Sequence, residues 1–164
     1  SVRNIIPPKA HPSQFRRILE SLDGVEAGGE TDLGQVLHEA AERTKRRGLI
    51  IVISDLIDNE EAIASGLGHF RHNNHEVIVF HTMDPAEIEF PYDRLTRFKD
   101  MEGLGRVVAN PKSLRRRYLS RINQFTDQVK RDCFERRISY ELCDTSKPYD
   151  KFLASYLDKR SRIF

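Results

Sequence analysis

The sequence predicts an α/β domain, a three-layer sandwich in which helices cover both faces of a mostly parallel central sheet. Two continuous apolar runs, at residues 49–53 and 76–81, have the composition of strands that are buried on both faces. A segment with helical periodicity separates them, so strand, helix and strand form one right-handed βαβ unit. The chain has 164 residues, which fits a single domain, and we assign residues 1–164 to it.

The part of the chain before the first apolar run predicts a short strand and two helices. Residues 2–6 are a β-branched run that stops at two prolines, as an extended segment does. Residues 13–22 have apolar side chains at helical spacing, and we expect one face of this helix to be buried. A second helix begins at Thr31 or Asp32 and runs to about Arg47.

The part after residue 81 predicts a hairpin, a long helix, a third strand and a final helix. The hairpin is expected around Gly103 and Gly105, and Pro111 begins a helix that ends near Arg137. The third strand covers residues 138–143, and an amphipathic helix follows it. The side chains that we expect in the core are Val52, Ile53, Val77, Val79, Leu114, Ile122, Phe125 and Leu142.

Composition argues against several classes of protein. The net charge of +2, from 27 basic and 25 acidic residues, gives no general attraction to nucleic acid. No apolar run is long enough to cross a bilayer, and residues 1–11 have no secretory signal, so we expect a cytoplasmic protein, with a membrane anchor upstream of Ser1 left open. Cys133 and Cys143 are expected to be reduced thiols, because cytosolic disulfides are uncommon, and a zinc site is not expected because neither has a second ligand at zinc spacing.

Polar residues follow the predicted strands at the carboxyl edge of the sheet, where open α/β sheets bind ligands. Ser54 and Asp55 end the first apolar run, and Thr31 and Asp32 open the helix before it. Hydroxyl and carboxylate oxygens are suitable ligands for Mg²⁺. The alternative is structural, with Thr31 and Asp32 as a helix N-cap and Asp55 as a strand-end cap.

A basic run on the predicted long helix is a second candidate site. Arg115, Arg116 and Arg117 stand beside Tyr118, and Arg121 follows one turn later. Such a cluster could bind phosphate or an acidic partner, and a solvated helix face is the alternative.

The sequence contains no catalytic signature of the Ser–His–Asp, Walker or GxGxxG type. Four histidines lie within residues 69–81, and without a His-Glu-x-x-His pattern we expect them to be solvated or to cap helices. We therefore predict that the chain is not an enzyme. The alternatives are a metal-assisted hydrolase or phosphatase that uses Asp55, and a nucleic-acid-binding fragment that uses residues 115–121.

Four segments together resemble the bacterial domain of unknown function 58 family. They read Gly-Gly-Glu-Thr-Asp-Leu-Gly (28–34), Arg-Arg-Gly-Leu-Ile-Ile-Val-Ile-Ser-Asp-Leu-Ile-Asp (46–58), Asn-His-Glu-Val-Ile-Val-Phe-His-Thr-Met-Asp-Pro-Ala-Glu (74–87) and Leu-Arg-Arg-Arg-Tyr-Leu (114–119). The resemblance extends from Gly28 to the C-terminus. It implies a von Willebrand factor A-like (vWA-like) domain, which is Rossmann-like, and a protein-interaction module that works with a MoxR-type AAA+ ATPase.

The vWA resemblance also implies a metal-ion-dependent adhesion site made of an Asp-x-Ser-x-Ser loop, a Thr and an Asp. Thr31 matches the Thr and Asp55 the last Asp, whereas Glu30 is an insertion in the usual Gly-Gly-Thr loop. The Asp-x-Ser-x-Ser segment is absent, so we expect a domain that lacks the first strands and a vestigial site. Two oxygen ligands would hold Mg²⁺ weakly. We therefore expect this chain to bind no cofactor, although an intact site of the family could bind Mg²⁺.

The implied strand order, 3-2-1-4-5-6, would place residues 49–53 beside the absent strand 1 and leave their edge unpaired. An unpaired apolar edge is a template for pairing with another chain. We therefore expect a homodimer, formed through residues 49–53 or by exchange of the N-terminal strands. The alternative is that residues 2–6 occupy the vacant place within one chain.

Overall fold

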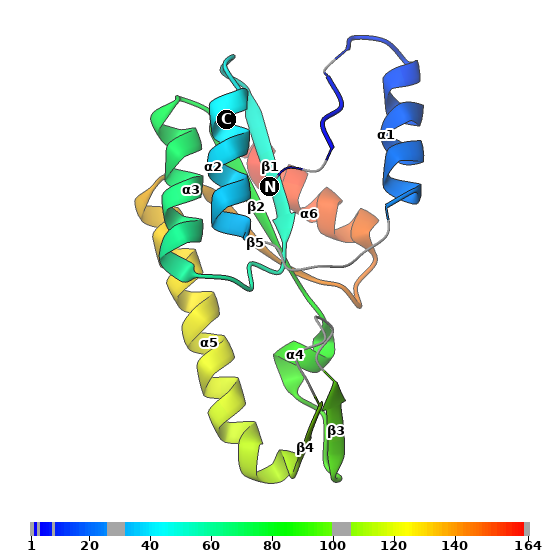
Figure 1. Cartoon of the computed structure of the whole chain (residues 1–164), viewed down its shortest axis with the longest axis vertical. Coiled ribbons are helices and arrows are strands. Elements are labelled where there is room, and N and C mark those ends of the chain that lie inside the picture. Colours follow the sequence, from blue (N-terminus) through cyan, green and yellow to red (C-terminus); the bar gives the residue numbers. More distant parts are fainter. Residues whose placement is uncertain (1, 3, 8, 26–31, 100–105, 163–164) are drawn as a thin grey trace.

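A parallel three-stranded sheet lies at the centre of the computed structural model, which describes residues 2, 4–7, 9–25, 32–99 and 106–162 (Figure 1). Its order is β1-β2-β5, with β1 at Leu49–Ser54, β2 at Glu76–Met83 and β5 at Ser139–Asp144. A second, antiparallel sheet pairs β3 (Thr96–Lys99) with β4 (Arg106–Ala109). The predicted α/β class, the parallel pairing and the hairpin are therefore confirmed.

Six helices occur in the part of the chain that the structure describes. They are α1 (Ser13–Asp23), α2 (Leu33–Arg43), α3 (Glu60–His72), α4 (Pro85–Glu89), α5 (Pro111–Glu135) and α6 (Tyr149–Ser161). Side-chain oxygens cap four of them, because the first N–H groups of a helix have no partner within it. These caps are Asp32 for α2, Asn59 for α3, Asp84 for α4 and Asn110 for α5.

Helices lie on both faces of the sheet, as predicted (Figure 1). Because side chains alternate along a strand, Val77 and Val79 of β2 point toward one face and pack into the core with α2, α3 and α5. Ile78 and Phe80 point toward the other face, where Phe80 makes edge-on ring contacts with Phe152 and Tyr156 of α6. β2 is thus the central strand and is buried on both sides.

The helices α2 and α3 pack closely because glycines lie at their contact. A Cβ atom added at Gly34 would lie 2.5 Å from the Cβ of Ala62, and one added at Gly66 would lie 2.6 Å from the Cβ of Leu37. Both distances are too short for any larger residue without movement of the helices. The two glycines therefore set the separation of α2 and α3 and, with it, the position of α2 over β1.

The prediction that residues 49–53 are buried on both faces is wrong. Exposed and half-buried residues alternate along β1, and Ile53 is 69% exposed. Leu142 and Leu114, also expected in the core, are each 39% exposed. A continuous apolar run shows that a strand can be buried on both faces, but neighbouring elements decide whether it is.

Two predictions for the N-terminal part are also wrong. The described residues within 2–6 are not a strand, and the Val2 N–H donates to Glu39 Oε2 of α2 at 2.9 Å. The helix α1 forms, but none of its residues is buried, and Phe15 is 69% exposed. Figure 1 shows α1 standing apart from the sheet, so its apolar side has no sheet face to pack against.

No helix in the described ranges is both long enough and apolar enough to span a membrane.

Candidate functional site

The carboxyl end of β1 carries Ser54 and the exposed Asp55. Asp55 Oδ1 accepts a hydrogen bond from the Ile57 N–H at 3.2 Å, and Ser54 Oγ accepts one from the Leu56 N–H at 3.1 Å. Leu56 itself is fully buried, with a left-handed φ of 56°. The two polar side chains therefore stabilise the sharp turn that leaves the strand, as a strand-end cap does.

The β1–α3 loop is tied to the start of α2 by Asp58. Asp58 Oδ2 accepts from the Leu33 N–H at 2.5 Å, and Oδ1 accepts from the Asn59 N–H at 2.6 Å. These backbone donors, Asn59 first, hold the pKa of the Asp58 carboxyl below its usual value. Sequence reasoning missed this link, because nothing local shows that Asp58 reaches a helix 25 residues earlier. Thr31, the other predicted metal ligand, lies outside the described residues.

His81 of β2 is the register partner of Ser54 and is fully buried. Its Nδ1 lies 2.8 Å from the Tyr140 hydroxyl, whereas its Nε2 makes no hydrogen bond of normal geometry within the described part of the chain. Burial lowers the pKa of His81, and the nearby Asp55 backbone and the Asp55 and Glu87 carboxylates oppose this shift only in part. A neutral imidazole therefore lies beneath the carboxyl edge.

His75 is also buried, at 1% exposure, but it caps the end of α2, so the expectation of solvated or capping histidines is wrong for His81 alone of these two. The Gly48 N–H donates to His75 Nδ1 at 3.2 Å, so His75 Nε2 carries the proton and donates to the Thr44 carbonyl at 3.1 Å. The Thr44 carbonyl is thereby used outside the helix. This explains why α2 ends at Arg43 and not near Arg47 as predicted.

The described residues contain no group of three or more His, Cys, Asp or Glu side chains that could hold a metal ion. The carboxylates of Asp58, which follows β1, and Asp84, which follows β2, already have partners. Asp58 binds two backbone amides, and Asp84 Oδ1 accepts from the Ala86 N–H at 2.7 Å to cap α4. The geometry of the described part therefore gives Asp55 no partner carboxylate for Mg²⁺.

Both cysteines are free, as expected. Cys133 is buried in the core, and burial raises the pKa of its thiol to about 11. A thiol in this state is a poor nucleophile and a poor metal ligand.

β1 has an open edge and an uncovered side. Among the described elements only β2 pairs with it, so its outer row of N–H and C=O groups has no strand partner there. On the α6 side Leu49, Ile51 and Ile53 are 48%, 49% and 69% exposed. We call these three residues the β1 strip. The open edge at 49–53 agrees with the prediction, and the described residues within 2–6 do not pair with it.

The structure divides the predicted arginine cluster of α5. Arg115 Nη1 donates to the Phe90 carbonyl at the end of α4, so Arg115 has a structural partner. Arg116 and Arg117 are exposed, and neither forms a hydrogen bond or ion pair that the structure describes. Arg121 lies 3.6 Å from Glu60 of α3.

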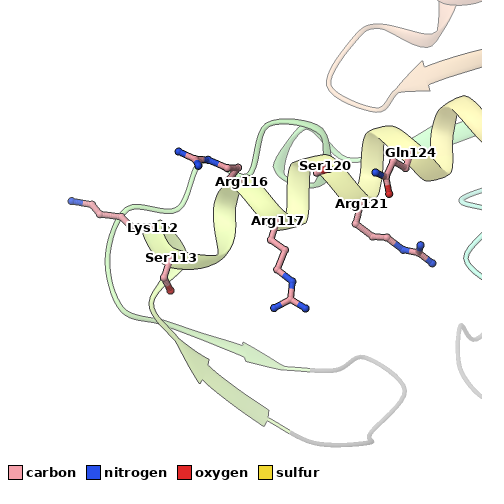
Figure 2. A pocket seen from close by; sticks show the side chains of 7 residues that line it. All are labelled: Lys112, Ser113, Arg116, Arg117, Ser120, Arg121 and Gln124. Carbon is pink, nitrogen blue, oxygen red and sulfur yellow. The ribbon is translucent and has the colours of Figure 1, made fainter.

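The exposed arginines belong to a wider basic surface. Figure 2 shows basic side chains extending from α5 in two directions, with small polar side chains among them. Together they line a shallow depression of about 780 Å³. We call this surface the basic face, and its residues are Lys112, Ser113, Arg116, Arg117, Ser120, Arg121 and Gln124.

Comparison with known proteins and protein families identifies the family of the chain. Neither the curated proteins nor the solved structures include one that is significantly similar to the chain. The family model described as "Protein of unknown function DUF58" matches residues 1–127, which is most of the chain. The chain therefore belongs to the DUF58 family of proteins of unknown function.

Proposed function

We propose that the chain is a protein-interaction module and that β1 is its docking element. The observation that carries this proposal is the open edge of β1 beside the exposed β1 strip. Proteins rarely leave a long, uncharged edge strand uncovered, because its free N–H and C=O groups pair readily with other chains. An added strand would pair these groups and cover part of Leu49, Ile51 and Ile53.

The occupant that we propose is a second copy of the chain. β1 reads Leu-Ile-Ile-Val-Ile-Ser and carries no charge, so two copies that meet antiparallel about a twofold axis encounter no repulsion. Such pairing would join two three-stranded sheets into one continuous sheet. A strand from another protein, or from elsewhere in the same polypeptide, is the competing occupant.

The test of the second copy is the molecular mass in solution. Light scattering at high micromolar concentration should give a dimer, and Ile53→Lys should shift it to the monomer, because a lysine on an edge strand disfavours pairing with another strand. Ile57→Lys is the matched control, since Ile57 lies outside the strand and is 68% exposed, close to the 69% of Ile53. This control should remain dimeric.

Two results would overturn the proposed dimer. A monomeric mass with slow hydrogen exchange at the 49–54 amides would mean that the edge is filled within one chain. A monomeric mass with fast exchange would mean that the edge stays open.

We further propose that the module is vWA-like and works with a MoxR-type AAA+ ATPase. Membership of the DUF58 family, the parallel sheet with helices on both faces, and Ser54 and Asp55 at its carboxyl edge support this. A purified MoxR-type ATPase from the same organism should bind the chain in sedimentation experiments, and the complex should change its rate of ATP hydrolysis. Absence of co-sedimentation and an unchanged rate would contradict the partnership.

A further inference from the structure

The N-terminal half of α5 has an unusual charge distribution. Residues 111–124 contain five basic side chains and no carboxylate, whereas residues 125–135 contain both signs. Cations near the N-terminus of a helix oppose its dipole and reduce its stability. The helix dipole therefore does not account for this cluster. Arg115 has a structural partner in the Phe90 carbonyl, and an anionic ligand would account for the other cations.

The basic face arranges its cations in two rows. Lys112 and Arg116 are four residues apart, and so are Arg117 and Arg121, which places the members of each row about 6 Å apart along the helix. Figure 2 shows Lys112 and Arg116 reaching in one direction and Arg117 and Arg121 in another. The small or neutral side chains of the face are Ser113, Ser120 and Gln124.

The cations of the basic face are available to a ligand. Arg116 and Arg117 have no ion-pair partner among the residues that the structure describes. Arg121 has one at 3.6 Å, Glu60, but the Arg121 side chain is 76% exposed. An exposed pair of this length contributes little to stability, so Arg121 can exchange Glu60 for another carboxylate at small cost.

We propose that the basic face binds an acidic segment of a partner protein. Carboxylates on every second residue of an extended chain are about 6.6 Å apart. This distance is close to the separation of about 6 Å, along the helix, between the two members of each cation row. The planar guanidinium groups of Arg116, Arg117 and Arg121 can each bind a carboxylate through two hydrogen bonds. The serine hydroxyls and the Gln124 amide add neutral donors beside them.

Nucleic acid fits this surface less well than an acidic segment does. Sites for single-stranded nucleic acid combine cations with exposed aromatic rings on which bases stack, and no aromatic residue lines the basic face. The nearest aromatic in sequence, Tyr118, packs on Phe90 with ring centroids 4.5 Å apart. The net charge of the chain is also only +2.

Fluorescence anisotropy tests the proposal. The probe is a labelled peptide of about twelve residues in which glutamate alternates with serine, since this repeat matches the spacing of the cation rows. Its controls are the same peptide with glutamine in place of glutamate, and an oligodeoxythymidylate of similar length. The chain should bind the glutamate peptide in preference to both, and salt should weaken the binding.

The decisive variant removes two cations from the basic face. Arg116→Gln with Arg117→Gln should weaken binding of the glutamate peptide about tenfold or more, because two charge-assisted contacts are lost. The matched control is Lys130→Gln with Arg131→Gln, which removes two exposed charges from the other half of α5 and changes the net charge equally. That control should change the affinity by less than about twofold.

Three outcomes would overturn the proposal. The first is the absence of binding to the glutamate peptide, and the second is an equal loss in the two double variants, which would mean attraction by net charge alone. The third is tighter binding of the oligonucleotide that depends on Arg116 and Arg117, which would assign the face to nucleic acid. The basic face contains no residue of β1, so the dimer measured with Ile53→Lys is an independent result.

Discussion

The two faces of the central sheet are covered to different extents at the same strand. On the face toward α2 and α3, Ile50 and Val52 of β1 pack against the main core. On the face toward α6, the helix covers Ile78 and Phe80 of β2, but the β1 strip remains exposed. One apolar strand therefore has a core on one side and solvent on the other. Composition makes a side chain suitable for burial, but its contribution to stability depends on what covers it.

The largest expected difference between the faces is in the cost of removing a side chain. Phe70 of α3 is 2% exposed and belongs to the main core, so Phe70→Ala should lower the free energy of unfolding by about 3–5 kcal/mol. Ile53→Ala should change it by less than about 0.5 kcal/mol, because that side chain is largely in water already. Urea denaturation at dilute protein concentration measures both. Equal losses would show that the β1 strip is covered.

A smaller effect is expected where α2 meets α3 on the closed face. Gly66→Ala should destabilise by about 1–3 kcal/mol, since the new methyl group would force the helices apart. Gly68→Ala, in the same helix, meets only the Arg136 side chain at 3.5 Å and should be neutral or stabilising by up to about 1 kcal/mol. Thermal melts of both variants give the comparison. A destabilised Gly68→Ala with a neutral Gly66→Ala would contradict this packing.

The pH dependence of stability should report the buried His81. Its pKa in the folded chain lies below the value of about 6.5 expected when unfolded, so the unfolded state binds the extra proton first. The free energy of unfolding should therefore fall as pH drops below about 6.5. His81→Gln should flatten this slope, whereas His72→Gln, at an exposed position, should leave it unchanged. A slope that is identical in all three proteins would contradict a neutral buried imidazole.

The smallest expected effect concerns Mg²⁺ at the carboxyl edge. Calorimetric titration of the chain with Mg²⁺ should give no saturable heat, because Asp58 and Asp84 are already bonded to backbone amides. Asp55→Ala should leave the titration unchanged. A micromolar dissociation constant that Asp55→Ala abolishes would establish a metal site that includes Asp55.

Much of the fold could be predicted from local sequence patterns. The apolar runs of β1 and β2, the helix start at Asp32 and the helix that Pro111 begins all depend on neighbouring residues, and each is predicted from them. The errors concern long-range contacts. Residues 2–6 have strand propensity but bind α2, and the amphipathic α1 has no surface to cover it. Propensity does not specify which element becomes the neighbour.

The candidate site was predictable to a smaller extent. The position of Asp55 at the carboxyl end of a strand follows from local sequence, and so does the presence of arginines on α5. The tie between Asp58 and Leu33, the burial of His75 and His81, and the bond of Arg115 to Phe90 each link segments far apart in the chain. Only the burial of His81 has a local signal, because His81 ends the run 76–81 that is predicted to be a buried strand. The other links have no signal in the neighbouring residues.

The packing of the N-terminal half of α5 has a consequence for motion in this protein. Tyr118 in this half of α5 forms a small aromatic cluster with Phe90, Tyr92 and Phe98. The cluster is distinct from the two cores around the sheet. A satellite cluster of this size can open without unfolding the sheet, as a separate cooperative unit. Amides at 112–121 should therefore exchange with solvent faster than those at 125–135, and an acidic ligand on the basic face would slow that exchange by holding this end closed.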